Sequence, residues 1–299
     1  MSARGDELLV AVGDEETSAA LDWAVGRALR SGLNLHLVHV AHSRHALAGR
    51  TLPTSDLDAA ESIGKELVRV AAQRVDRQSG AALRVSTSVP TGRPAVVLAE
   101  MASACAAVVL QHRPHGAAAS VFGGSVAAGV AARVDVPVVS VPEAWEATLT
   151  SDDGGLAPRV TVGVAEPAAA DALIRHAIDT YRGREFVVTL LHAWHVSSAH
   201  ELGLKPQDFE AEWIEREAER LSDLAAAWQT KSPNGQVESR ILHGRPVSVL
   251  QEASRDSEHL VVGLSHAHPR GHVGSVTASL LRHAACPVEV LPASPAAPQ

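Results

Sequence analysis

Aromatic residues and cysteines are scarce in this sequence. Phe, Trp and Tyr make up 3% of the 299 residues, and Cys105 and Cys286 are the two cysteines. They lie in different halves of the sequence and form no CxxC pair, which suits a reducing cytosol better than a secreted, disulfide-held domain. No apolar run approaches the roughly 18 residues that a membrane-spanning helix needs, and the N-terminal apolar run is too short for a signal peptide. We therefore expect a cytoplasmic protein.

Excess positive charge and catalytic signatures are missing as well. The net charge is −8, so the sequence has no electrostatic footprint for nucleic acid or for an anionic membrane. The patterns GxxxxGKS/T, GxSxG and HExxH do not occur, and no GxGxxG follows a predicted strand. We therefore expect no enzyme, and neither nucleic acid nor membrane as a partner.

The sequence does contain an internal repeat. Gly92-Arg93-Pro94 returns as Gly244-Arg245-Pro246, and Gly124-Ser125-Val126 returns as Gly274-Ser275-Val276. Both offsets are about 150 residues, which is the size of a whole domain. We therefore expect two copies of one fold, with the following boundaries: domain 1 over 1–147, a linker over 148–158, domain 2 over 159–293, and a frayed tail over 294–299.

Each half alternates short apolar runs with longer helical patterns, which is typical of an α/β fold with a parallel sheet and crossover helices. Leu21, Ala24, Val25, Ala28 and Leu29 form one stripe of a predicted helix that ends at Gly32. The predicted strands are 8–12, 33–40, 84–89, 106–110 and 137–141 in the first half, and 160–164, 185–193, 236–242, 259–264 and 287–291 in the second. The third strand of each half alternates in polarity, which places it near a sheet edge.

The repeated Gly-Ser at a helix start suggests phosphate binding. Backbone N–H groups at a helix N-terminus lack partners within the helix, and the helix dipole favours an anion there. A glycine permits close backbone approach, and a hydroxyl adds a donor. The occurrence of this feature after the fourth predicted strand of both halves makes it a candidate site.

The Gly-x-Pro helix starts, the Gly-Ser-Val junctions and the closing stretch His283–Val290 resemble the universal stress protein family. The arrangement is similar to its tandem, two-domain members, which are frequent in actinobacteria. The resemblance implies two doubly wound, Rossmann-like domains. Each would hold a five-stranded parallel sheet of order 3-2-1-4-5, with helices on both faces. It also implies association through the final strands, either between copies or between the two domains of one chain.

In the ATP-binding branch of that family, an Asp ends the first strand and Gly-x2-Gly-x9-Gly-Ser follows the fourth. The Asp position falls on Gly13 and Ala165 here, and Leu110 replaces the first glycine of the first half. The resemblance therefore implies a degenerate site for ATP or another adenine nucleotide. The candidate residues are Gly263, His266, Gly274, Ser275 and Val276 in the second half, with Arg113, Gly124, Ser125 and Val126 in the first.

Histidines and cysteines offer alternatives. His36 and His39 would point to opposite faces of a strand, so we expect no metal site, and His39 aligns with His192 as a scaffold histidine. A cluster of His266, His268 and His272 is more simply a solvated loop. Cys105 could be a thiol sensor, although no neighbouring base supports this role, and Cys286 is expected to pack as a small apolar residue.

Three functions remain open from the sequence. The first is a stress-response regulatory or protective module with weak adenine-nucleotide binding and no turnover. The second is an interaction or scaffold protein that acts without nucleotide through unidentified protein partners. The third is a slow ATPase. The sequence argues against it, because it shows no catalytic base, no acidic metal-ligand set and no phosphate-binding lysine.

Overall fold

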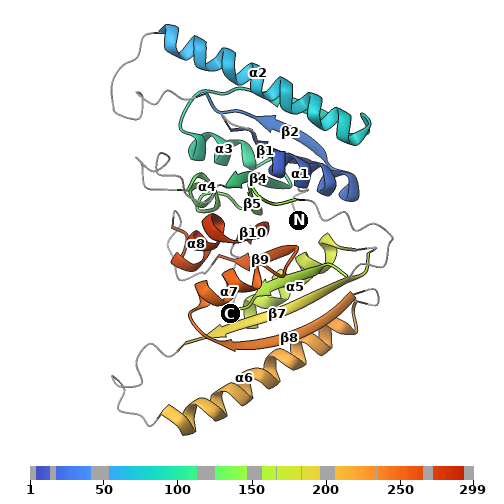
Figure 1. Ribbon diagram of the computed structural model, residues 1–299, viewed down its shortest axis with the longest axis vertical. Coiled ribbons are helices and arrows are strands. Elements are labelled where there is room, and N and C mark those ends of the chain that lie inside the picture. The colour runs from blue at the N-terminus through green and yellow to red at the C-terminus, as the bar shows by residue number, and fades with distance from the viewer. Residues whose placement is uncertain are drawn as a thin grey trace. The chain divides into compact units, whose positions relative to one another are not determined.

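The computed structural model describes residues 5–13, 18–41, 54–112, 125–146, 157–165, 167–182, 184–195, 206–232, 235–264 and 272–292 (Figure 1). The elements of the first repeat are β1 (Glu7–Ala11), α1 (Ser18–Ser31), β2 (Asn34–Val38), α2 (Thr54–Ser79), β3 (Val85–Ser88), α3 (Pro94–Ala102), β4 (Ala107–His112), α4 (Val126–Ala131) and β5 (Val138–Pro142). Strands and helices alternate, as the sequence predicts.

The second repeat has the same element order. Its elements are β6 (Arg159–Gly163), α5 (Pro167–Thr180), β7 (Phe186–Trp194), α6 (Pro206–Gln229), β8 (Gly235–His243), α7 (Pro246–Ala253), β9 (His259–Gly263), α8 (Ser275–His283) and β10 (Val288–Leu291). The predicted strands agree with the observed ones, with end points that differ by a few residues.

The strands of each repeat follow the predicted order. In the first repeat the order is β3-β2-β1-β4-β5, and in the second it is β8-β7-β6-β9-β10. Neighbouring strands run parallel, as β1 does with β2 and β6 with β7. β3 and β8 follow β2 and β7 outward in these orders, which confirms the edge positions expected from their alternating polarity.

The core of the first repeat lies between its strands and the helices α1 and α2. Leu21, Ala24, Val25 and Ala28 are buried, and they pack in one cluster with strand residues such as Val10. Leu29, which the helical stripe also includes, is 48% exposed, so that part of the predicted stripe is wrong. Gly32, with φ of +66°, ends α1, which confirms the predicted stop because a left-handed residue after a helix favours glycine.

The helices form two sets in the first repeat. α1 contacts α2, and α2 packs on β2 and β3, whereas α3 contacts α4 (Figure 1). In the second repeat α5 contacts α6, and α7 packs on β7. This arrangement is the doubly wound α/β fold expected from the sequence. No helix in the described ranges is both long and apolar enough to cross a membrane.

Backbone contacts divide the molecule into two compact units. The first unit consists of Met1–Ala147, Leu264–His283 and Glu289–Pro292, and the second of Thr148–Gly263, Ala284–Val288 and Ala293–Gln299. α8 therefore belongs to the first unit, although the sequence repeat assigns it to the second half. The domain boundaries expected from the sequence follow the repeat, and they stay a prediction.

Candidate nucleotide-binding site

Two helices begin at a Gly-Ser, and α8 is longer than α4. Ser275 is the first residue of α8 and is exposed, while Gly274 and Val276 are half-buried. The backbone N–H of Ala278 donates to the Gly274 oxygen at 2.9 Å, so regular helical bonding begins here. The earlier N–H groups of a first helical turn have no partner within the helix and favour an anion. The helix start thus has the elements of a phosphate contact.

At the start of α4 the serine hydroxyl is engaged by its own helix. Ser125 is the N-cap residue in an extended conformation, and its Oγ accepts a hydrogen bond from the Ala128 N–H at 3.4 Å. The Gly129 N–H donates to the Ser125 oxygen at 2.9 Å. Val126 is 39% exposed beside this cap. The Ser125 hydroxyl therefore already satisfies one donor of its own helix, and α4 has only 6 residues.

The strand ends lack the acidic group of the ATP-binding pattern. Gly13 and Ala165 follow β1 and β6, and both are exposed. Leu110 is 5% exposed within β4, so a packed side chain occupies the position of the first pattern glycine. At Gly263 an added Cβ would lie 3.4 Å from Leu173 Cδ2, which is an ordinary contact. Packing against α5 therefore does not by itself require a glycine at the end of β9.

The candidate residues do not all fall in one unit. Gly274, Ser275 and Val276 belong to the first unit, together with Ser125 and Val126, whereas Gly263 belongs to the second unit. The other candidate residues lie outside the described residues, and these are Arg113, Gly124 and His266. The assignment of a nucleotide to these positions stays a prediction.

Gln111 of β4 is a polar residue with a structural contact that the sequence did not predict. Its Oε1 accepts a hydrogen bond from the Ala20 N–H, in the first turn of α1, at 3.2 Å. In the first repeat an internal side chain thus occupies one of the free donors at the start of α1. The signal was a polar residue directly after the buried strand run that ends at Leu110.

The two aligned histidines have a structural role. His39 is buried, and its Nδ1 lies 2.9 Å from the Val12 oxygen. His192 repeats the contact at 2.8 Å from the Val164 oxygen. This confirms the prediction of a scaffold histidine. Within the described ranges no group of three or more His, Cys, Asp or Glu side chains could hold a metal ion. His268 lies outside those ranges.

Both cysteines are free and buried. Burial raises the pKa of the Cys105 thiol, with a further contribution from the negative charge of Glu7. Burial raises the pKa of Cys286 to about 12. Because the thiolate is the reactive form, neither residue has the environment of a thiol sensor. The expectation that Cys286 packs as a small apolar residue is confirmed.

A comparison with family models matches both halves of the sequence. The model described as the universal stress protein family matches residues 6–142 and again residues 157–292. The chain belongs to the universal stress protein family. The two matches reproduce the repeat on which the tandem interpretation was based.

Individual relatives agree with this assignment. A universal stress protein of Mycolicibacterium smegmatis is 26% identical over 288 residues, which cover 92% of this chain and 93% of the relative. A universal stress protein of Mycobacterium tuberculosis is 38% identical over 79 residues, which cover 26% of this chain. That match spans only 30% of the length of the Mycobacterium tuberculosis protein.

Solved structures show the same fold. The crystal structure of a universal stress protein from Archaeoglobus fulgidus matches with a TM-score of 0.63 and 16% identity, covering 96% of this chain and 97% of that one. A protein of Pseudomonas aeruginosa described as functionally unknown matches with a TM-score of 0.56 and 16% identity, covering 96% and 92% of the two chains. At this identity the likeness concerns the fold alone.

Proposed function

We propose that the protein is a cytoplasmic stress-response module of the tandem type, regulatory or protective, which binds an adenine nucleotide such as ATP weakly and does not turn it over. The helix start of α8 is the main phosphate contact in this proposal. The exposed Ser275 hydroxyl at the first position of a nine-residue helix is the observation that carries it. A hydroxyl and unpaired backbone donors at one point suit a phosphate oxygen.

The start of α4 is the weaker contact. The Ser125 Oγ already accepts from the Ala128 N–H, so a ligand there competes with the helix cap. A helix of six residues also has fewer aligned peptide dipoles than α8. These differences favour binding at α8 over binding at α4.

Several features support weak rather than tight binding. Neither Gly13 nor Ala165 can accept a hydrogen bond from a ribose or adenine with its side chain, as an Asp would at the same place. Leu110 and Gln111 fill the end of β4 in the first repeat with side chains. A nucleotide therefore relies on phosphate contacts, which are also open to other polyphosphates.

Thermal unfolding with and without ATP tests the proposal. Saturating ATP should raise the midpoint of wild-type unfolding, since a ligand at 100 times its Kd stabilises by about 2.7 kcal/mol. Ser275→Ala should lose most of this shift, while Ser125→Ala should keep most of it. Mass spectrometry of gently purified and then denatured protein should recover adenine nucleotide. No shift in ATP together with an empty protein would refute nucleotide binding.

The second candidate function is an interaction protein that needs no nucleotide. Gln111 favours it, because a protein side chain takes one α1 donor that a ligand could otherwise use. Self-association or domain pairing through the final strands also fits this reading. An unchanged midpoint in ATP, combined with copurification of a defined protein partner, would favour this function.

A slow ATPase is the third candidate function. A phosphate-release assay separates it from the other two, because a module without turnover releases no phosphate above the buffer rate. Phosphate release that Ser275→Ala abolishes would establish turnover and overturn the proposal of a non-enzyme.

A further inference from the structure

A cavity of about 650 Å³ lies in the second unit, on one face of β6, β7 and β8 and beside α7. Thr189 and Leu191 of β7 line it, together with Arg240 and Leu242 of β8. On the helix side, Val249 and Ala253 are among the lining residues. The volume falls within the range of about 300–1,000 Å³ typical of small-molecule sites.

The matched positions of the first repeat show what distinguishes this face. The matched pairs are Glu7 and Arg159, Leu9 and Thr161, Ser86 and Glu238, Ser88 and Arg240, Met101 and Ala253, and Cys105 and Ser257. The match is supported by one shared contact: Cys105 Sγ lies 3.6 Å from the Met101 oxygen, and Ser257 Oγ lies 2.7 Å from the Ala253 oxygen. The second repeat thus has smaller or more polar side chains where the first has Leu9 and Met101.

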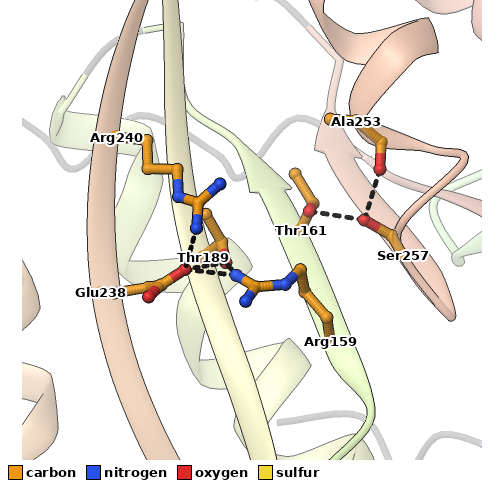
Figure 2. Close-up of polar contacts among 7 residues, drawn as sticks. All are labelled: Arg159, Thr161, Thr189, Glu238, Arg240, Ala253 and Ser257. Atoms are coloured by element: carbon orange, nitrogen blue, oxygen red, sulfur yellow. Dashed lines mark hydrogen bonds and ion pairs between the residues drawn. The ribbon is translucent and has the colours of Figure 1, made fainter.

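The polar groups on the sheet side form one connected network. Glu238 Oε1 accepts hydrogen bonds from Arg159 and from the Thr189 hydroxyl, the latter at 2.8 Å, and it forms an ion pair with Arg240 Nη2 at 3.3 Å (Figure 2). Desolvation raises the pKa of Glu238, but hydrogen bonds from Arg159 and Thr189 and both cations outweigh it, so its pKa lies below the usual value. The guanidinium groups of Arg159 and Arg240 therefore share the one carboxylate of Glu238. These three side chains together carry a net charge of one positive unit.

Arg240 is the better placed of the two cations to meet a ligand. Its side chain is 54% exposed, against 32% for Arg159, which is held by both Thr189 and Glu238. One guanidinium carries five N–H donors in a planar fork that suits a carboxylate, sulfonate or phosphate. The acidic lining residues Glu252 and Asp256 lie in or just after the C-terminal part of α7, and Glu252 pairs with Arg255. The more exposed guanidinium of Arg240 is therefore the favoured contact for an anionic group.

We propose that this cavity binds a small amphiphilic organic anion. Its apolar body would lie against Leu191, Leu242 and Val249, and its anionic group would accept hydrogen bonds from Arg240. Thr161, which also lines the cavity, is held by a 2.7 Å hydrogen bond between its hydroxyl and that of Ser257 (Figure 2). Neither Gly263 nor Ser275 lines the cavity, so this site is separate from the nucleotide contact proposed above.

Two related dyes test the ligand class directly. The first is 8-anilinonaphthalene-1-sulfonate, an aromatic anion, and the second is N-phenyl-1-naphthylamine, which has the same rings without the sulfonate. We expect saturable fluorescence enhancement with one sulfonate dye per chain, and weaker binding of the neutral dye. Equal affinity for the two dyes, or no saturable binding of the sulfonate, would overturn the proposal.

Two variants locate the site. Ala253→Met restores the larger side chain of the first repeat and should weaken both dyes about tenfold or more by filling the cavity. Arg240→Gln should weaken the sulfonate about tenfold, since a charge-assisted hydrogen bond is lost, and should leave the neutral dye within about twofold. Arg182→Gln is the matched control, because Arg182 is exposed, pairs with Asp179 and does not line the cavity.

Urea unfolding of each variant checks that the fold is retained. If Ala253→Met does not fold, the ratio of the two dye affinities in Arg240→Gln still decides the outcome. Sulfonate binding that persists unchanged in Arg240→Gln would place the dye elsewhere and would refute the site.

Discussion

His39 lies with its Nδ1 2.9 Å from the backbone oxygen of Val12 and joins the end of β2 to the residue after β1. A carbonyl oxygen only accepts, so Nδ1 carries the proton in this contact. His192 makes the equivalent contact to Val164 in the second repeat. His39 is 4% exposed and His192 is half-buried. We therefore expect the stability of the first repeat to depend more on His39 than the stability of the second depends on His192.

The packing around His39 predicts a coupled pair of mutations. A Cβ added at Gly64 of α2 would lie 2.6 Å from His39 Cδ2 and 2.7 Å from Val89 Cγ1. Gly64→Ala should therefore destabilise the first repeat by about 1–3 kcal/mol through overpacking. In the His39→Ala background the cost of Gly64→Ala should fall by about 0.5 kcal/mol or more. Urea unfolding of the four proteins measures this coupling.

Gly80→Ala offers a control for the same cycle. Gly80 has φ of +59° and no atom within 4 Å of an added Cβ, so its cost should come from backbone strain and should not depend on His39. Strict additivity of Gly64→Ala and His39→Ala would show that the imidazole does not limit the approach of α2.

The buried cysteines predict unreactive thiols. At neutral to mildly alkaline pH, Cys286, with a pKa of about 12, and Cys105, with a raised pKa, should remain almost wholly protonated. Ellman's reagent should label neither thiol in the folded protein, and should label both in concentrated guanidinium chloride. Cys105→Ser should reduce the denatured count from two to one. Rapid labelling of the native protein would restore the thiol-sensor interpretation of Cys105.

The network at Glu238 predicts a pH-dependent contribution to stability. The folded-state pKa of Glu238 is below the ordinary value of 4.5, so ionisation stabilises the fold above that pH. The contribution is lost as the pH falls through the folded pKa. Glu238→Gln should therefore destabilise the second unit at neutral pH, and its difference from wild type should shrink as the pH is lowered. Urea unfolding over this acidic range provides the measurement.

Glu66 supplies a matched comparison for Glu238. The hydrogen bond from Arg69 is the main cause of the lowered pKa of Glu66, but this pair is exposed on α2. Exposed ion pairs contribute little because solvent screens them. Glu66→Gln should thus show a much smaller pH-dependent difference. Similar profiles for the two variants would mean that the Glu238 network is also screened.

The sequence was sufficient for the element order because buried parallel strands are continuous apolar runs. Leu8–Val12 and its counterpart Val160–Val164 could be found in this way. Leu29 could not be placed correctly, because a periodic stripe does not show how wide a face the neighbouring elements cover. The grouping of α8 with the first unit also escaped the sequence, since a repeat shows ancestry and not which contacts a helix makes.

The candidate sites were less accessible from the sequence. The Gly-Ser helix starts could be found because the repeat shows them twice. The network of Arg159, Thr189 and Glu238 could not, because it depends on the register that places Thr161, Thr189 and Glu238 in one row across three strands. Residues about 30 to 50 positions apart meet there, and no local pattern indicates which residues of parallel strands become neighbours.

The Gly-Arg-Pro motif gives a final prediction. Gly92 and Gly244 have φ of +146° and +149°, values that L side chains rarely adopt, and an added Cβ would lie 2.8 Å from Val97 Cγ2 or 2.9 Å from Val249 Cγ2. Gly92→Ala should therefore cost about 1–3 kcal/mol from backbone strain, in addition to the steric contact. Adding Val97→Ala removes the contact but not the strain, so urea unfolding should show only partial recovery of Gly92→Ala relative to Val97→Ala alone. Full recovery would show that the motif keeps its glycine for packing rather than for backbone conformation, and it would then be tolerant of larger residues wherever the facing valine is shortened.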